Sequence, residues 1–354
     1  MAKVLMKGNE AIAEAAIMAG CRYFFGYPIT PQNQIPEYLS KRLPEEKGVF
    51  IQAESEIAAI NMVYGAAGTG ARVMTSSSSP GISLKQEGIS YIAGAELPAV
   101  IVNIMRGGPG LGSIQAAQGD YFQATKNGHG DYHLIVLAPH TVQEACDLVQ
   151  LAFDLADQYR CPTMILGDGM LGQMMEPVEL IRRARTNLPE KTWAARGFRG
   201  EKRKPNIINS LYLEPEEMQV LATRLKEKYA LIRENEVRYE AYHTDGAEYV
   251  LVAYGTVARI AKAAAAMLEK EGVHVGVLRP ITLWPFPYEA VKAVAEQEGM
   301  KAFLAVEMSA GQMVEDVLIG ANGIKPVQFH GHADCIAPTA QEIAQVILQM
   351  ERGV

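Results

Sequence analysis

Cysteine is scarce in this sequence. The four cysteines are Cys21, Cys146, Cys161 and Cys335, and no two of them form a Cys-x-x-Cys pair. Residues so far apart cannot present a ligand set for zinc or for an iron–sulfur cluster from closely spaced loops. We therefore interpret all four as small buried hydrophobic residues. Any redox centre that works with this protein would have to lie on another chain.

The sequence also lacks long apolar runs and an excess of positive charge. No stretch approaches the roughly 18 uninterrupted apolar residues of a membrane span, and the N-terminal residues lack the apolar core of a signal peptide. The formal net charge of −7 disfavours nucleic-acid binding, because phosphate neutralisation needs a positive field. With 49% hydrophobic and 21% charged residues, the chain is predicted to be globular and cytoplasmic, without a nucleic-acid or membrane partner.

What the chain does contain is an alternation of β-rich and helical patterns. Within residues 1–186, strands are predicted at 23–25, 49–52, 72–75, 99–105, 134–137 and 163–166, and helices at 8–19, 56–67, 83–93 and 142–156. Such alternation indicates a doubly wound α/β domain with right-handed βαβ units and a parallel sheet. The same rhythm returns in residues 247–354, which predict a second, smaller α/β domain. Ligands of such folds bind beyond the carboxyl ends of the strands.

The intervening residues 187–246 do not follow this rhythm, and we interpret them as a linker or excursion. A basic stretch, residues 182–204, overlaps their start. Its nine cationic side chains are Arg182, Arg183, Arg185, Lys191, Arg196, Arg199, Lys202, Arg203 and Lys204. A charged helical pattern follows from 214 to 240. The simplest interpretation of the basic stretch is a solvated linker.

The first candidate site segment is Gly26-Tyr-Pro-Ile-Thr-Pro31, directly after a predicted strand. Two prolines around Thr30 restrict the backbone and remove amide donors, so that they hold the threonine hydroxyl in one place. The alternative is a rigid turn that binds no ligand.

The second segment is Glu54-Ser55-Glu56, at a predicted strand-to-helix junction. Carboxylates in a first helical turn are favoured by the helix dipole, so that simple capping is one interpretation. However, the flanking strand and helix are apolar. A buried carboxyl that can share a proton would suit a ring nitrogen that needs a proton donor.

The third segment is Asn103-Ile-Met-Arg-Gly-Gly-Pro-Gly110, in which Arg106 precedes a glycine-rich loop at the end of the strongest predicted strand. An arginine fork next to such a loop can approach a small anion closely and bind a carboxylate in bidentate fashion. The alternative is a surface arginine in a flexible loop. The glycine-rich loop alone is weak evidence for an anion site, because it has neither the P-loop nor the GxGxxG spacing.

Taken together, these segments resemble the alpha subunits of 2-oxoacid:ferredoxin oxidoreductases, relatives of pyruvate:ferredoxin oxidoreductase. The resemblance covers nearly the whole chain. It rests on residues 26–31, on Gln52-Ala-Glu-Ser-Glu-Ile-Ala-Ala59, Met105-Arg-Gly-Gly108, Gln118-Gly-Asp120 and Arg279-Pro-Ile-Thr-Leu-Trp-Pro285. Residues 107–112 and 120–123 are most similar to the 3-methyl-2-oxobutanoate (2-ketoisovalerate) subgroup. The resemblance implies a thiamine-diphosphate domain of the pyrimidine-binding type followed by a domain like the transketolase C-terminal domain.

The resemblance also implies roles for three residues. Glu56 matches the family glutamate that hydrogen-bonds the aminopyrimidine ring of thiamine diphosphate. Thr30 matches the threonine beside substrate and cofactor, and Arg106 matches the arginine that orients the oxoacid carboxylate. No roles follow for Gln118 and Asp120. The implied reaction is oxidative decarboxylation of a 2-oxoacid to acyl-coenzyme A and carbon dioxide, with electrons passing to ferredoxin.

The same resemblance implies partners. Beta, gamma and delta type subunits would complete the complex and carry the iron–sulfur clusters, and a beta subunit would supply the magnesium–diphosphate site. We expect no metal ligands on this chain, and we interpret Asp168, in a Gly-Asp-Gly sequence like the start of a diphosphate motif, as structural. The basic stretch would then face an acidic partner or the phosphates of coenzyme A, if it is more than a linker.

Three alternatives remain open at this point. The oxoacid could be 2-oxoglutarate or pyruvate. The chain could belong to another thiamine enzyme, such as a transketolase-like or dehydrogenase component, although the motif at residues 26–31 speaks against this. It could also be a non-catalytic structural subunit, although the presence of Thr30, Glu56 and Arg106 together speaks against that.

Overall fold

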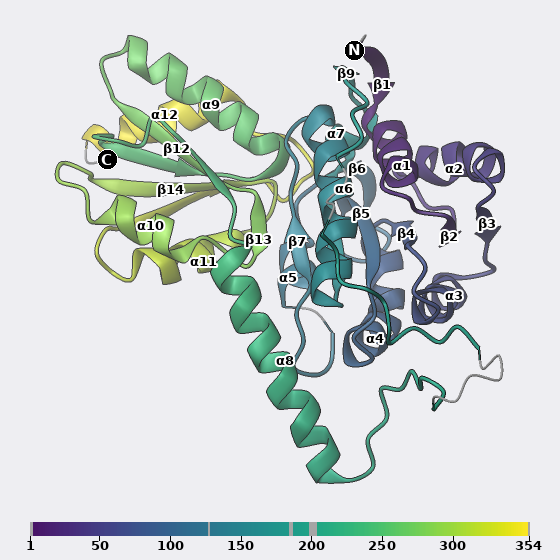
Figure 1. The fold of residues 1–354 in the computed structure, drawn as a ribbon. Coiled ribbons are helices and arrows are strands. Elements are labelled where there is room, and N and C mark those ends of the chain that lie inside the picture. The colour runs from purple at the N-terminus through teal and green to yellow at the C-terminus, as the bar shows by residue number, and fades with distance from the viewer. Residues whose placement is uncertain (1–2, 127, 184–186, 198–203, 353–354) are drawn as a thin grey trace.

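The computed structural model describes residues 3–126, 128–183, 187–197 and 204–352. Two α/β bodies lie side by side in Figure 1, the N-terminal one from purple to teal and the C-terminal one from green to yellow. These two bodies confirm the mixed α/β architecture that the sequence predicts. No helix in the described ranges is both long and apolar enough to cross a membrane.

The N-terminal body contains nine strands and seven helices within its described residues. The strands are β1 (Val4–Lys7), β2 (Tyr23–Gly26), β3 (Val49–Gln52), β4 (Val73–Ser77), β5 (Ala99–Gly107), β6 (Ser113–Ala116), β7 (Ile135–Leu137), β8 (Pro162–Asp168) and β9 (Met175–Val178). The helices are α1 (Gly8–Met18), α2 (Gln34–Glu45), α3 (Glu56–Gly68), α4 (Ser79–Gly94), α5 (Tyr121–Thr125), α6 (Val142–Tyr159) and α7 (Gly169–Gln173).

The main sheet has the order β13-β7-β8-β5-β4-β2-β3, with β6 paired to β5. Its strands from β7 to β3 are mutually parallel. Strands β4, β5 and β8 are buried along their whole length, as expected for a parallel sheet that is covered on both faces. Helix α1 packs against both α2 and α6, and α3 packs on α4.

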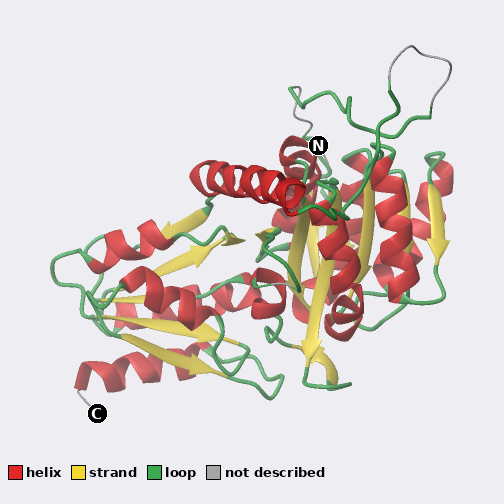
Figure 2. Ribbon diagram, turned by 90° about the horizontal axis from the view of Figure 1, so that it is seen from below, coloured by secondary structure: helices red, strands yellow, loops and turns green. Residues whose placement is uncertain are grey.

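The rest of the chain forms a second sheet of order β10-β12-β11-β14-β15. Its elements are α8 (Pro215–Asn235), β10 (Tyr239–Tyr242), β11 (Tyr249–Val252), α9 (Gly255–Lys270), β12 (Val275–Pro280), β13 (Thr282–Trp284), α10 (Tyr288–Ala295), β14 (Ala302–Glu307), α11 (Met313–Ala321), β15 (Val327–Gly331) and α12 (Ala340–Arg352). Figure 2 shows helices on both sides of these strands.

Four features differ from the expected pattern. Helix α4 begins at Ser79, four residues before its expected start at 83, and α8 ends at Asn235 instead of near 240. Strand β10 lies within the range expected to be a linker, and it pairs antiparallel with β12. Strand β13 leaves the second domain and pairs with β7 of the main sheet, so that the two domains share a sheet edge.

Buried side chains also join the two domains. The amide of Gln118 donates to Tyr254 O (3.0 Å) and accepts from Met308 N (3.1 Å). The carboxylate of Asp168 accepts from Leu171 N at the start of α7 and from the hydroxyl of Thr256 in α9. These contacts fix the C-terminal domain against the carboxyl ends of β5 and β8.

The cysteines are placed as expected with one exception. Cys21, Cys146 and Cys161 are buried, and burial raises the pKa values of Cys21 and Cys161 to about 12 and that of Cys146 to about 11. The expectation of burial is wrong for Cys335, which is partly exposed at a positive φ of 65°. This residue lies in the loop between β15 and α12 and meets the backbone of Gly107, where a Cβ would lie 2.2 Å from its sulfur.

Candidate functional site

The candidate site lies where the order of the main sheet reverses. Strand β3 pairs with one side of β2, and β4 pairs with the other. A crevice opens at such a switch point, beyond the carboxyl ends of the strands, and ligands of α/β proteins bind there. Thr30 follows β2, Glu56 follows β3 and Arg106 ends β5, so that all three candidate residues lie at this edge.

Thr30 and Arg106 are in direct contact. Nη1 of Arg106 donates to the carbonyl oxygen of Thr30 (3.1 Å), and Nη2 donates to the carbonyl of Leu111 in the glycine-rich loop (3.2 Å). Arg106 is only 9% exposed, yet its buried Nε has no hydrogen-bond partner among the described residues. The side chain of Thr30 is exposed beside it. The arginine is therefore held in place with one donor free.

A polar network fixes the backbone of Arg106 from below. The hydroxyl of Ser79 accepts from Arg106 N (3.0 Å) and donates to Asp120 (2.6 Å). The side chain of Asn103 accepts from Ser79 N (3.1 Å) and donates to Asp120 (3.0 Å). Burial raises the pKa of Asp120, although these hydrogen bonds and the nearby charge of Arg106 oppose the shift.

Glu56 is the first residue of α3 and is 6% exposed, whereas Glu54 is exposed. The N-cap of this helix is Ser55, whose hydroxyl accepts from Ala58 N (3.2 Å). Because Ser55 provides the side-chain cap, the alternative that Glu56 is only a capping carboxylate loses its main support. The structure thus distinguishes the two carboxylates between which the residues alone left the choice open.

The carboxyl group of Glu56 lies against the first turn of α4. A Cβ at Gly81 would lie 2.7 Å from Oε1 of Glu56 and 2.1 Å from the hydroxyl oxygen of Ser77. Only glycine fits between these groups. The hydroxyl of Ser77 is buried and without a hydrogen-bond partner in the described part of the chain, as is that of Ser78. Two unpaired hydroxyls therefore lie at the edge that holds Glu56.

One more charged group is buried behind this edge. Lys85 of α4 is fully buried, and its Nζ donates to the hydroxyl of Thr75 (2.7 Å) and to Ser76 O (3.0 Å). Burial lowers the pKa of Lys85 to about 7, against the opposing effect of the Glu56 charge.

Sequence reasoning missed part of this site. The four serines at residues 76–79 match no catalytic motif, but they form the end of β4 and the start of α4. Asp120 belongs to one of the family motifs, but the sequence indicated no role for it. Lys85 gave no signal, because a lysine within a helical pattern is expected on the solvent side.

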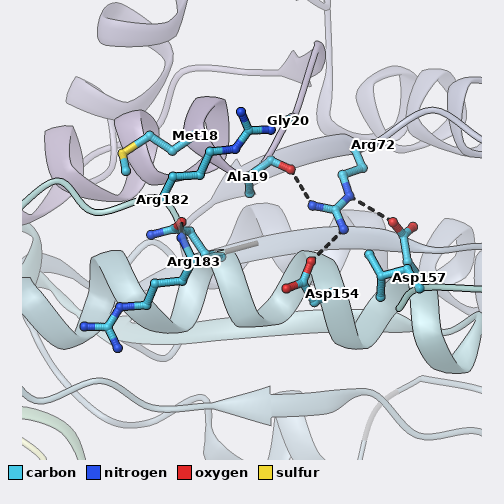
Figure 3. A pocket seen from close by; sticks show the side chains of 10 residues that line it. Met18, Ala19, Gly20, Arg72, Asp154, Asp157, Arg182 and Arg183 are labelled. Carbon is cyan, nitrogen blue, oxygen red and sulfur yellow. Dashed lines mark hydrogen bonds and ion pairs between the residues drawn. The ribbon is translucent and has the colours of Figure 1, made fainter. Parts of the chain in front are cut away.

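Two arginines of the basic stretch lie far from this edge. Arg182 and Arg183 line a surface pocket of about 350 Å³ near Arg72, which precedes β4 and therefore marks the amino ends of the strands. Figure 3 shows that Arg72 itself is engaged by Asp154 and Asp157 of α6.

Two cations of the stretch form ion pairs with α6. Arg183 contacts Asp147 (3.0 Å) and Lys191 contacts Asp157 (2.5 Å), which supports a structural role for this part. Arg185, Arg199, Lys202 and Arg203 lie outside the described residues. In the described ranges, no group of three or more His, Cys, Asp or Glu residues could hold a metal ion.

Comparisons with protein families agree with the motifs. Residues 14–246 match the family described as pyruvate flavodoxin/ferredoxin oxidoreductase, thiamine diphosphate-binding, and residues 247–343 match the pyruvate:ferredoxin oxidoreductase core domain II. The first of these matches alone covers more than half of the chain.

Curated relatives are similar over almost their whole length. The chain is 53% identical over 330 residues to ketoisovalerate oxidoreductase subunit VorB of Methanothermobacter marburgensis, covering 93% of this chain and 92% of the relative. It is 37% identical over 377 residues to 2-oxoglutarate synthase subunit KorA of Methanothermobacter thermautotrophicus, covering 98% of each.

Solved structures show the same fold. The 2-oxoglutarate:ferredoxin oxidoreductase from Magnetococcus marinus, solved with 2-oxoglutarate, coenzyme A and succinyl-CoA bound, has a TM-score of 0.87 at 26% identity; the match covers 98% of this chain but 65% of that one. A split-gene transketolase, an inactive beta4 tetramer, has a TM-score of 0.61 at 15% identity over 97% of both chains, which supports the fold alone. The resemblance that the motifs predict is thus confirmed: the chain belongs to the pyruvate flavodoxin/ferredoxin oxidoreductase family, whose members include subunits of 2-oxoacid oxidoreductases.

Proposed function

We propose that this chain provides the pyrimidine side of a thiamine diphosphate site in a cytoplasmic 2-oxoacid:ferredoxin oxidoreductase. The complex would convert a 2-oxoacid, 3-methyl-2-oxobutanoate in the first place, to acyl-coenzyme A and carbon dioxide, with electrons passing to ferredoxin. The observation that carries this proposal is the buried carboxyl of Glu56, held against Gly81 at the switch point of the sheet.

Glu56 fits the pyrimidine end of the cofactor. Its carboxyl is shielded from water but lies at the edge of the sheet where ligands bind, so that it can exchange a proton with a ring nitrogen. The unpaired hydroxyls of Ser77 and Ser78 offer further polar contacts at the same edge. When bound, thiamine diphosphate supplies the electron sink for decarboxylation. The contribution of this chain is to orient the ring and hold the proton at Glu56.

Arg106 fits the carboxylate of the oxoacid. A buried guanidinium with a free Nε can add a charge-assisted hydrogen bond to an anion. Its two Nη atoms are already tied to the carbonyls of Thr30 and Leu111, so the fork is fixed before substrate binds. The exposed hydroxyl of Thr30 lies beside it, which suits a threonine that contacts both substrate and cofactor.

The surroundings of Glu56 support a partner subunit. Helix α3 is apolar on nearly all sides, and a helix of this kind is normally covered. Instead, Ile57 on α3 and Leu84 on α4 are 52% and 51% exposed, and Leu111 and Ile114 near Arg106 are 85% and 59% exposed. We infer that a beta type subunit covers this surface and brings the magnesium and diphosphate site. Gamma and delta type subunits would carry the iron–sulfur clusters and pass electrons to ferredoxin.

The choice of oxoacid rests on the relatives. The VorB subunit, named for ketoisovalerate, is 53% identical, against 37% for the KorA subunit, named for 2-oxoglutarate. The motif at residues 107–112 points to the same subgroup.

Co-expression of this chain with its genomic neighbours tests the function. The purified complex should reduce viologen when 3-methyl-2-oxobutanoate, coenzyme A and thiamine diphosphate are all present. 2-Oxoglutarate and pyruvate should give lower kcat/KM values. A preference for either of them would overturn the substrate assignment, and failure of all three oxoacids in a complex with intact clusters would overturn the proposed reaction.

A further inference from the structure

Lys85 lies at the point where α3 and α4 cross. Two glycines of α4 let the helices approach: Gly81 meets Glu56, and at Gly88 a Cβ would lie 2.4 Å from the side chain of Ile60. Lys85 stands one turn after Gly81 and one turn before Gly88 on α4. Its side chain runs into the protein and ends at β4, where Nζ contacts Thr75 and Ser76. The lysine is thus buried in the same α3–α4 contact as Glu56, one turn along α4 from Gly81.

A lysine in this position is costly. Burial of an ammonium group without a paired carboxylate is strongly unfavourable, and no ion pair of Lys85 occurs within the described ranges. Its two hydrogen bonds go to a neutral hydroxyl and to a carbonyl. A methionine or leucine could fill the same space in an apolar helix crossing without that cost. The charge itself therefore calls for an explanation.

We propose that Lys85 is a positioning residue that acts through Glu56: its ammonium charge stabilises the Glu56 carboxylate and so favours transfer of the shared proton to the ring nitrogen of the bound aminopyrimidine. This inference rests on the proposed role of Glu56. The step it governs is the movement of one proton between the Glu56 carboxyl and that nitrogen, and no other bond changes.

The charged groups around Lys85 differ in their partners. Arg106 at the end of β5 and Asp120 before α5 both contact Ser79, the first residue of α4. Arg106 is bound to Thr30 and Leu111, and Asp120 to Asn103. Glu56, on α3, is the charge that acts on Lys85 electrostatically. The two residues therefore form a coupled pair.

The coupling predicts a pH dependence. Burial lowers the pKa of Lys85 to about 7, so that it loses its charge in the neutral range. Below this pH the ammonium supports the Glu56 carboxylate, and above it the support ends. The ring nitrogen should therefore lose its proton more readily as the pH rises from 6 to 8.5.

Three variants of the assembled complex test this inference. Lys85→Met removes the charge at similar volume, Lys85→Arg keeps a charge that does not titrate, and Lys228→Met is a matched control. Lys228 is largely buried, with a side chain that is 11% exposed, but it pairs with Glu96 and contacts Arg160 far from the site. Two readouts apply to each variant: the ¹⁵N resonance of thiamine diphosphate labelled at the pyrimidine ring nitrogen, and kcat, both measured from pH 6 to 8.5.

In the wild type, the ratio of protonated to neutral ring nitrogen should fall by about tenfold over this range, because one pKa unit corresponds to a tenfold change in ionised fraction. Lys85→Met should start about tenfold lower and lack the transition, and kcat should follow while KM for the oxoacid stays constant. Lys85→Arg should keep the protonated form at high pH. Lys228→Met should behave as the wild type does.

A wild-type ¹⁵N response and kcat profile in Lys85→Met would overturn the inference and leave Lys85 as a packing residue. If Lys85→Met does not assemble, the comparison of wild type with Lys85→Arg tests the inference instead. Identical pH responses of these two proteins would overturn the inference. Failure of the proposed function has a different signature: Glu56→Gln would then remain active whatever Lys85 does.

Discussion

Arg279 clamps Glu144 with two hydrogen bonds of 2.9 Å, from Nη1 to Oε2 and from Nη2 to Oε1. These two hydrogen bonds join β12 of the C-terminal domain to the first turn of α6 in the N-terminal domain. Nε of the same guanidinium donates to Glu240 (2.9 Å). Arg279 begins one of the family motifs, and at 3% exposure it holds the two domains together, distant in sequence from the candidate site.

Removal of this clamp should destabilise the protein. Arg279→Met leaves the Glu144 carboxylate without its main partner, and loss of one member of a buried ion pair costs about 3–5 kcal/mol. Arg259→Met is the matched control, because the Arg259–Glu176 pair is more exposed, at 41% and 23% of the two side chains, and should contribute less than about 1 kcal/mol. Chemical unfolding of both variants measures the difference, and equal costs would show that the clamp contributes little.

The clamp should also persist in acid. Burial would raise the pKa of Glu144, but the hydrogen bonds from His140 and Arg279 and their charges lower it from 4.5 to about 2. A group with a lowered folded-state pKa adds stability that is fully present above its unfolded pKa and is lost as the pH falls through the folded value. The stability difference between wild type and Glu144→Gln should therefore be constant from pH 7 to about 5 and shrink between 4.5 and 2. A difference that shrinks above pH 5 would contradict the assignment.

Arg106→Lys should weaken oxoacid binding selectively. A point charge replaces a fork that is fixed by Thr30 and Leu111, so the KM for the oxoacid should rise by about tenfold or more, as expected when a charge-assisted hydrogen bond is lost. The affinity for thiamine diphosphate should hardly change. Arg183→Lys, at the opposite end of the sheet, serves as the control. Loss of thiamine binding with an unchanged KM would instead place Arg106 at the cofactor.

The chain purified alone should contain no stoichiometric iron and show no oxoacid-dependent viologen reduction. Three of its four cysteines are buried, and Cys335 stands by itself in a loop. Iron analysis and absorbance spectra of the chain, compared with those of the complete complex, provide the measurement. Stoichiometric iron in the isolated chain would refute the assignment of the clusters to partner subunits.

Much of the fold could be predicted from the sequence, because alternating apolar strands and helices of ordinary length leave little freedom. Strand β3 and the start of α3 occur at their predicted residues. The family and its fold class followed from motifs and are confirmed by the comparisons. Strand β13 could not be foreseen, because it is short and gains its partner β7 only through the tertiary arrangement.

The residues of the candidate site could likewise be predicted only in part. Thr30, Glu56 and Arg106 were found because prolines, glycines or paired carboxylates surround them. Their role in catalysis remains a prediction. The supporting residues Ser79 and Lys85 were missed, and Asn103 had no role assigned, because their importance depends on burial and on contacts between distant segments, which a local pattern does not reveal.

The central claim is that Glu56 exchanges a proton with the thiamine ring. An amide cannot do this, and loss of such acid–base assistance typically lowers turnover by about 10²–10⁴-fold. The most direct test compares kcat of the assembled complex carrying Glu56→Gln with that carrying Glu54→Gln, the exposed carboxylate two residues away. We expect Glu56→Gln to assemble and fold normally but to lose at least 99% of its turnover, with Glu54→Gln close to wild type. A Glu56→Gln complex that keeps more than about half of wild-type turnover, well above the range for lost acid–base help, would contradict the account.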